Sequence, residues 1–282
     1  MSTSANSPTY RPLTVIEHSS GWIPIRFGEV WHHRELVYFF AWRDLKIRYA
    51  QTLFGAIWTV FQPLALVVVF SLAFRKLGNI NTGGIPYPVF ALAGLVFWNF
   101  FSSSLGRGAN SLIANSQLLT KTALPRVLIP FSTVISSLVD FLIGLVLYFA
   151  IALAYGVHPT WRVVVMPAVL LLGITLAVGL ILILSATNVR YRDVGQALPF
   201  LTQLWLFLSP VAYPLDKLGP TLKTILAFNP LVGIIEAFRW SVAGSQPPSA
   251  SALGYSIACS GVALVVGLFY FARVERTFAD VV

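Results

Sequence analysis

The hydrophobic positions of this chain form long runs separated by short polar segments. A helix needs about 20 mostly apolar residues to cross the hydrocarbon core of a membrane. Six runs approach or exceed that length, at residues 53–74, 87–105, 127–155, 163–186, 197–213 and 251–272. We therefore expect an all-α integral membrane protein with six transmembrane helices, in which residues 51–282 form the transmembrane domain.

The composition indicates that lipid is the solvent for much of the chain. Hydrophobic residues make up 57% of it and charged residues only 10%, whereas soluble domains carry about 25% charged residues. The formal charge of +9 could indicate nucleic-acid binding. However, the basic residues lie in short clusters between apolar runs rather than in one stripe, which is typical of membrane topology. We expect membrane lipids as partners and no nucleic acid.

The distribution of the 19 Lys and Arg residues predicts the orientation. Cytoplasmic loops of membrane proteins carry an excess of these residues. If the N-terminus is cytoplasmic, the residues that fall outside are Arg75, Lys76, Arg162, Lys217, Lys223 and Arg239, and all others fall inside. The bias predicts a multi-pass protein of the plasma membrane with both termini in the cytoplasm. Residues 1–28 contain no apolar core of a signal peptide and are expected to be a cytoplasmic tail.

Residues 29–50 have the pattern of an amphipathic helix at the membrane interface. One helical face carries Tyr38, Trp42, Leu45 and Tyr49, which are spaced 4, 3 and 4 residues apart. Arg43, Lys46 and Arg48 surround that face, as expected for aromatic rings in the membrane and cations at the headgroups. Leu36, Phe40 and Ile47 form a second apolar face, which indicates that this helix also packs against protein.

A weaker apolar stretch, residues 224–242, lies between the fifth and sixth predicted spans. It contains Pro230, Glu236 and Arg239, so it is too polar and too interrupted for a seventh span. We interpret it as outer re-entrant helices. Two charges at this depth are tolerable only against water or each other, and we expect Glu236 and Arg239 to cap an exit.

The sequence lacks the motifs of catalysis and of nucleotide binding. No Gly-Lys dipeptide is present, so the chain has no Walker A loop. His32 and His33 are adjacent and would point about 100° apart on a helix, which does not suit a shared metal ion. Cys259 is the single cysteine and lies in an apolar run. We expect a protein that is not an enzyme, with no metal or cofactor, whose energy comes from a partner or an ion gradient.

Two features of the predicted spans admit more than one interpretation. Asp140 lies deep in the third span and has no evident basic partner in another span. It could line a polar path or form a helix–helix hydrogen bond, for example to Ser136 or Ser137, and a proton relay is a third reading. The aromatic cluster containing Phe97, Trp98 and Phe101 could face lipid or offer ring faces to passing sugars.

Several segments of the chain form a familiar pattern when they are taken together. The first is residues 42–49 with Gln51, Thr52, Gly55, Trp58 and residues 62–64. The others are residues 110–113 with Lys121, residues 124–126, Ile129 and Pro130, then residues 188–193, 207–214, 229–231 and 236–239. In this order the segments resemble those of the ABC-2 type permeases, and within that family those of the polysaccharide exporters for O-antigen, capsule, teichoic acid and related glycans. One departure is Leu124, where family members often carry an aromatic residue.

The resemblance implies a homodimer that works with two copies of a cytoplasmic ATPase, which would hold the ATP and magnesium. The implied cargo is a glycan on a polyprenyl diphosphate. On this basis we expect the substrate path to use Phe97, Trp98, Phe101 and Asp140. The lipid diphosphate would enter near Arg43, Lys46 and Arg48. Leu112, Ile113 and Lys121 would lie in a short cytoplasmic helix that couples the permease to the ATPase.

Rival functions predict features that the sequence does not display. An ion-coupled secondary transporter would need an inverted repeat and paired ionisable residues within the membrane. A membrane enzyme would need a cluster of acid, base or metal-binding residues, whereas Asp193, Asp216 and Glu236 are scattered along the chain. Within the same family, the alternative is an ABC-2 exporter of drugs or other lipids.

Overall fold

The computed structural model describes residues 33–50, 57–76, 82–117, 125–215, 218–275 and 278. Within them every regular element is a helix, so the all-α prediction is confirmed. The helices are α2 (Arg34–Ala50), α3 (Ile57–Lys76), α4 (Tyr87–Ala114), α6 (Leu128–Ala154), the 3₁₀ helix η1 (Trp161–Val165), α7 (Met166–Arg190), α8 (Asp193–Phe207), α9 (Pro220–Ala227), α10 (Leu231–Ala243) and α11 (Ala250–Val274).

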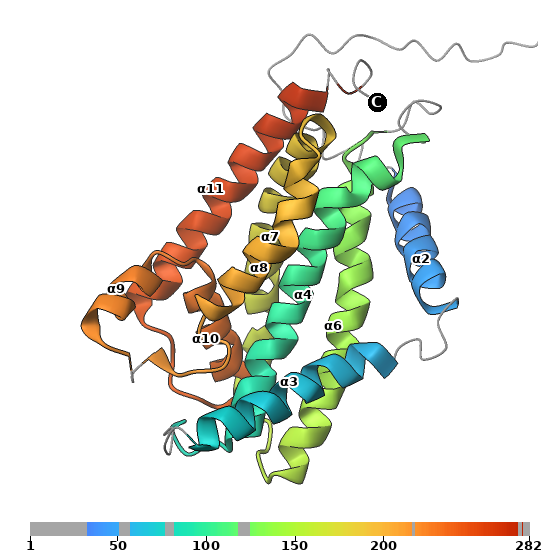
Figure 1. Ribbon diagram of the computed structural model, residues 1–282. Coiled ribbons are helices and arrows are strands. Elements are labelled where there is room, and N and C mark those ends of the chain that lie inside the picture. The colour runs from blue at the N-terminus through green and yellow to red at the C-terminus, as the bar shows by residue number, and fades with distance from the viewer. Residues whose placement is uncertain are drawn as a thin grey trace, which may run out of the picture.

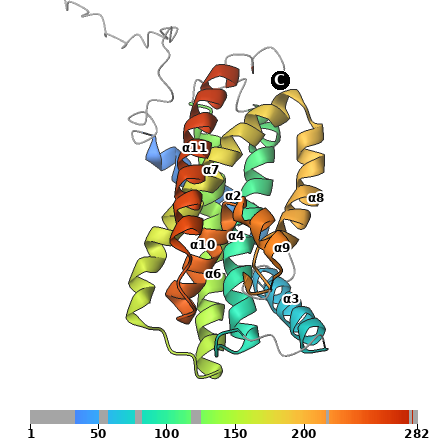
Figure 2. The ribbon, with the colours of Figure 1, turned by 90° about the vertical axis from the view of Figure 1, so that its left-hand side faces the viewer.

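The fold is a bundle built around α4, as Figures 1 and 2 show. This helix packs against α3, α6, α7, α8 and α10. Its sequence is apolar on every side from Val89 to Trp98, which is the pattern of a helix buried on all sides. Of the other long helices, α6 and α7 pack against α4, whereas α11 packs against α7 and α10.

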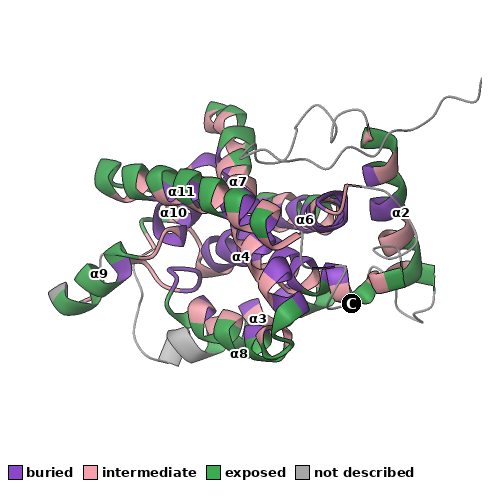
Figure 3. Cartoon of the chain, turned by 90° about the horizontal axis from the view of Figure 1, so that it is seen from above, coloured by how far each residue is buried: buried purple, intermediate pink, exposed green. Residues whose placement is uncertain are grey.

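The exposed sides of the outer helices are apolar. Val146 on α6 is 71% exposed, and Leu171 on α7 and Val262 on α11 are similarly open. The view along the bundle shows buried residues gathered at the centre and exposed residues around the rim (Figure 3). An apolar rim around an apolar core is expected when the surroundings are hydrocarbon rather than water.

Four of the described helices are long and apolar enough to cross a membrane: α4, α6, η1 with α7, and α11. A fifth candidate is the pair formed by residues 221–227 and α10, which is bent by 92°. Helices occupy the first and fifth predicted spans as well. However, the apolar part of α3 ends at Leu72 and α8 has only 15 residues, so the six-span prediction is not confirmed.

The first two described helices are arranged differently from the expectation. Figure 1 shows α2 running alongside α6, and α3 crossing obliquely over the ends of α4 and α6. On α2, Val37, Phe40 and Ala41 are buried, whereas Tyr38 and Trp42 stack on each other and remain exposed. The helix therefore has one face against protein and one open aromatic face.

Glycines bring α7 and α11 into close contact. A Cβ atom on Gly179 would lie 2.4 Å from the carbonyl carbon of Ala263, and one on Gly267 would lie 2.4 Å from the carbonyl oxygen of Gly179. These distances are well below contact between real side chains and backbone. The two helices can approach this closely only because both positions lack side chains, as is common between membrane helices.

This contact predicts the effect of Gly179→Ala. Forcing a methyl group into a packed contact costs about 1–3 kcal/mol, so the variant should unfold at a lower temperature in detergent. Gly261→Ala is the matched control on α11, because a Cβ atom there meets nothing within 4 Å. The control should be neutral or slightly stabilising, since alanine favours helices. Equal unfolding temperatures for the two variants would contradict the proposed packing.

Candidate functional site

A partly buried charged cluster joins α2, α4 and α6 around Asp140. The Asp140 carboxylate accepts hydrogen bonds from the Arg48 guanidinium and the Tyr49 hydroxyl, both on α2. Arg107 Nη1 on α4 donates to the same carboxylate at 2.9 Å. The Asp140 side chain is only 15% exposed, so a single carboxylate binds two cations from two other helices.

Two serines also accept hydrogen bonds from Arg107. Its Nη2 donates to Ser103 Oγ at 2.9 Å and to Ser137 Oγ at 2.6 Å. Ser103 lies one turn before Arg107 on α4, and Ser137 lies one turn before Asp140 on α6. These spacings of four and three residues put each serine on the same helical face as its charged neighbour. The cluster thus has donors and acceptors from both spans.

The structure corrects the expectation that Asp140 has no basic partner in another span. Asp140 does have a basic partner in another span, because α4 continues past Leu105 to Ala114 and carries Arg107 into the bundle. The sequence alone predicted the end of the span at residue 105, because two glycines flank a charged residue at positions 106–108. Of the readings left open for Asp140, the geometry matches helix–helix pairing, with Arg48 and Arg107 as the principal partners instead of the serines.

The tyrosine of the cluster remains protonated. Burial, and next the hydrogen bond to Asp140, raise the pKa of the Tyr49 hydroxyl above its usual range. A neutral phenol can donate its proton to the carboxylate, whereas a phenolate could not. Tyr49 therefore attaches α2 to α6 beside Arg48.

The basic residues of α2 differ in their surroundings. Arg43 Nη2 bonds Asn115 Oδ1 at 2.6 Å, just beyond the end of α4, and Asp44 Oδ1 at 3.1 Å. Arg48 is engaged by Asp140, and Lys46 is exposed. Of the three residues predicted to meet a lipid diphosphate, Arg43 and Arg48 thus already bind other parts of the protein.

The aromatic residues predicted to line a path lie in the core. Phe97 and Phe101 have no exposed surface, and Trp98 is 5% exposed. Phe97 packs in a ring cluster with Phe100, Phe141 and Phe238, and Phe101 meets Trp205 edge to face at 5.4 Å between centroids. Side chains without surface cannot line a channel between two copies in this conformation, so their burial argues against that prediction.

The predicted coupling helix is the end of a span. Residues 110–114 belong to α4, and Leu112 is fully buried against the bundle. Leu112 is therefore unavailable to a partner in this conformation, because it is part of the core. Ile113 is partly exposed, and Lys121 lies outside the described residues.

The outer element between α8 and α11 is a sharply bent pair of helices, which fits either a re-entrant loop or a broken span, so the re-entrant prediction is not confirmed. Residues 221–227 and α10 meet at 92° around Asn229 and Pro230. Asn229 bonds Trp205 Nε1, the Leu208 carbonyl, Ser209 Oγ and the Leu231 amide. These bonds fix the bend to the end of α8.

Arg239 does not face water at an exit, and the prediction that it caps one is wrong in this conformation. Its side chain is 3% exposed, and its guanidinium lies 3.7 Å from the Phe90 ring centroid. It donates to the carbonyls of Phe90, Pro210 and Val211 at 3.2, 2.7 and 3.0 Å. Arg239 thus joins α10, α4 and the segment after α8, whereas Glu236 is partly exposed.

A second polar junction could not be predicted from the sequence, because it joins Asn188 to residues of α4 that lie about 80 positions earlier in the chain. Asn188 near the end of α7 donates to the Ala109 carbonyl and to Asn110 Oδ1 on α4. Its own Oδ1 accepts from the Gly195 amide on α8 at 2.9 Å. A Cβ atom on Gly195 would lie 2.6 Å from Asn110 Oδ1. One asparagine therefore joins the three helices α4, α7 and α8 at this end of the bundle.

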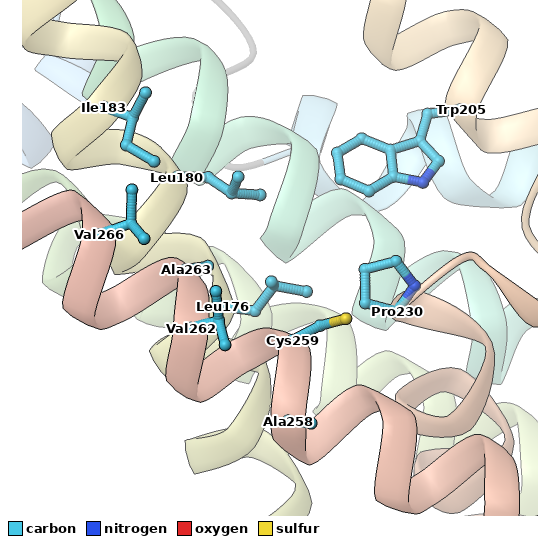
Figure 4. Close-up of a pocket in the computed structure, with 10 residues that line it drawn as sticks. All are labelled: Leu176, Leu180, Ile183, Trp205, Pro230, Ala258, Cys259, Val262, Ala263 and Val266. Atoms are coloured by element: carbon cyan, nitrogen blue, oxygen red, sulfur yellow. The ribbon is translucent and has the colours of Figure 1, made fainter.

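An apolar cavity of about 440 Å³ lies between α7, α8 and α11. In Figure 4, Leu176 and Ile183 on α7 face Cys259 and Val266 on α11, with Trp205 of α8 on the opposite wall. All the side chains that line it are apolar apart from the thiol and the indole nitrogen. Trp205 Nε1 donates to Asn229 at 3.0 Å, so its ring offers only carbon to the cavity.

The described residues contain no cluster of three or more metal-binding side chains. The chemistry of the site is that of ion pairing and packing between helices, without an arrangement for general acid–base or nucleophilic catalysis. The fold and these interactions define the class of the protein as a multi-pass helical membrane protein.

Comparison with known proteins identifies the family. The family model for ABC-2 type transporters matches residues 35–243, and the chain belongs to that family. It is 33% identical over 254 residues to an O-antigen export system permease protein, RfbA, of Myxococcus xanthus, covering 89% of this chain and 97% of that protein. An RfbA of Klebsiella pneumoniae is 26% identical, covering 85% of this chain and 92% of that protein. The polysialic acid transport protein KpsM of Escherichia coli is 25% identical, covering 83% and 91%.

Proposed function

We propose that this chain is the permease subunit of an ATP-driven exporter that moves polyprenyl-diphosphate-linked polysaccharide from the cytoplasm across the plasma membrane. The observation that carries the proposal is the match to the Myxococcus xanthus relative along nearly its whole length. That relative and the other two are named for the export or transport of polysaccharides. The multi-helix bundle with an apolar rim suits such a role.

In this proposal the energy comes from a separate ATPase. The sequence has no Walker A loop, so two copies of the permease would work with two copies of a nucleotide-binding partner. The docking surface would lie at the end of the bundle where α4 ends and α6 begins, near Ile113 and the segment that contains Lys121. There Arg126 Nη1, just before α6, donates to the Glu275 carbonyl, just after α11, at 2.6 Å. A displacement of the start of α6 by the ATPase would therefore also displace the end of α11.

The substrate path would use exposed surface of the fifth predicted span. On α8, Phe200 is 65% exposed and Phe207 is 57% exposed. In a dimer, the same rings of the second copy would lie across the dimer axis from these. The two sets of aromatic faces would line the path and bind sugars weakly, as the passage of a long polymer requires. The lipid diphosphate would approach α2 at Lys46, and contact with Arg43 or Arg48 would need those side chains to exchange partners.

A genetic experiment tests this function. Deleting the gene should remove the surface polysaccharide and cause lipid-linked glycan to accumulate on the cytoplasmic side. The wild-type gene should restore export only when the partner ATPase keeps its Walker A lysine. Normal surface polysaccharide in the deletion strain, with no accumulated lipid-linked glycan, would contradict the proposal and favour the export of drugs or other lipids.

A further inference from the structure

The cavity between α7, α8 and α11 opens to the surroundings at membrane depth. Two of the residues in its wall on α11, Val262 and Val266, are 63% and 49% exposed. Its volume of about 440 Å³ lies in the range of about 300–1,000 Å³ that is common for ligand sites. Because its walls offer almost only carbon, a fitting occupant is a hydrocarbon chain.

The register of the two spans places cations above this cavity. On α7, Leu176 and Ile183 line it, and the next residue in steps of seven is Arg190. On α11, Cys259 and Val266 line it, and the next residue in steps of seven is Arg273. Seven residues are nearly two helical turns, so each arginine lies close to the face of the lining residues beneath it. Both arginines are exposed at the same end of the bundle.

A polar pair lies between the cavity and the arginines. Thr187 Oγ1 on α7 and Tyr270 Oη on α11 are 3.1 Å apart and join the two helices. Thr187 is seven residues after the lining residue Leu180, and Tyr270 is seven residues after the lining residue Ala263. Toward the C-terminal ends of α7 and α11, the apolar side chains of the cavity are therefore followed by hydroxyl groups and then by guanidinium groups.

We propose that this surface binds one anionic phospholipid, with an acyl chain in the cavity, its ester region at Thr187 and Tyr270, and its phosphate at Arg190 and Arg273. Ile183 and Leu176 lie about 10 and 21 Å below Arg190 along the helix axis at 1.5 Å per residue. Half of a bilayer that is about 40–45 Å thick including its headgroups is about 20–22 Å deep. The cavity thus lies where an acyl chain would run if its phosphate met the arginines.

The order of groups along α7 and α11, first apolar side chains, then hydroxyls and then arginines, favours a phospholipid over a second copy of the chain. The exposed helices of a second copy would present apolar side chains to the cavity but no phosphate to the arginines. A bound acyl chain would fill the space between α8 and the pair α7–α11, because Trp205 on α8 forms the opposite wall. The lipid would thereby fix the position of α8 relative to the rest of the bundle. The inference does not depend on the identity of the exported cargo.

Native mass spectrometry of the full chain in detergent micelles tests the proposal. Phosphatidylglycerol and phosphatidylcholine with identical acyl chains would be titrated separately. A basic residue near a membrane surface contributes about fivefold in binding to an anionic lipid, so the two arginines should favour phosphatidylglycerol by about 25-fold. The variant Arg190→Gln with Arg273→Gln should lose this preference, and each single variant should lose part of it. Arg192→Gln, an exposed arginine at the same end, should retain it.

Alkylation of Cys259, the single cysteine of the chain, reports whether the lipid occupies the cavity. Bound phosphatidylglycerol should slow the reaction with a small apolar maleimide, and Ala258→Phe should weaken the binding of both lipids by filling the cavity. A preference that survives the double substitution, or an unchanged reaction rate, would overturn the proposal. So would protection by a second copy without lipid, seen as a dependence on protein concentration. Stronger protection by a prenyl phosphate would assign the cavity to the substrate's tail instead.

Discussion

Replacing Asp140 with asparagine is expected to destabilise the protein by about 3 kcal/mol, because two guanidinium groups would remain next to each other without their shared carboxylate. Removing one partner of a buried ion pair typically costs about 3–5 kcal/mol, and the partial exposure of this cluster favours the lower value. The loss should appear as a lower unfolding temperature in detergent. A distance probe between α2 and α6 should also show separation, since Arg48 and Tyr49 hold α2 at Asp140.

Asp44→Asn is the matched control for Asp140→Asn. Asp44 pairs with its neighbour Arg43 on the same helix, so its replacement should cost at most about 1 kcal/mol. A triple variant with Asp140→Leu, Arg48→Met and Arg107→Met should recover much of the lost stability, because no unpaired charge remains. If Asp140→Asn behaves like the control, the cluster does not hold α2 in place.

The second large effect is expected for Arg239→Lys. A lysine keeps the charge but cannot present the planar fork that reaches Phe90, Pro210 and Val211 together. Unsatisfied buried carbonyls cost about 1–3 kcal/mol each, so we expect a loss of about 3 kcal/mol and a loosening of α10 from α4. The unfolding temperature and the yield of folded protein in detergent measure this effect.

Arg162→Lys provides the comparison at the same end of the bundle. Arg162 makes one bond of 3.3 Å to the Gly244 carbonyl and lies over the Trp240 ring. Its replacement should change the unfolding temperature little, because a partly exposed arginine with one weak bond can be replaced by solvent. Equal effects at the two positions would show that Arg239 is not a structural connection between the helices.

The long spans could be predicted because each contains its own signal. The run 127–155 matches α6 (Leu128–Ala154), and the run 251–272 matches α11 (Ala250–Val274) to within two residues. An apolar run of this length needs no partner to be recognised, since hydrocarbon surroundings alone require it to be helical. The family could also be predicted, because its motifs occur in order along the chain.

The last turns of α4 could not be predicted in the same way. Gly108 leaves room for Ile181 on α7, since a Cβ atom at Gly108 would lie 2.5 Å from that side chain, and Arg107 pairs with Asp140, which is 33 residues away. Both partners lie on other helices, so the local sequence shows only two glycines around a cation. The serines at positions 103 and 137 did indicate a polar contact between the two helices, since each lies one turn from the charged residue of its own span.

The role of the aromatic residues also depended on distant neighbours. An aromatic ring in a membrane helix can face lipid, line a path or lie in the core, and its sequence position does not separate these cases. Phe97 lies in the core because Gly173 leaves room for its ring and Phe238 packs on it. Arg239 was misplaced for the same reason, since its carbonyl partners come from α4 and from the segment after α8.

The most direct test of the account is to purify the permease together with the ATPase that we propose as its partner and to identify the lipid that copurifies by mass spectrometry. We expect a polyprenyl diphosphate that carries a glycan, retained when ATP hydrolysis is blocked and released when it proceeds. A complex that forms with the ATPase but retains only phospholipids, while ATP turnover responds to a small hydrophobic compound and not to the glycan lipid, would contradict the account.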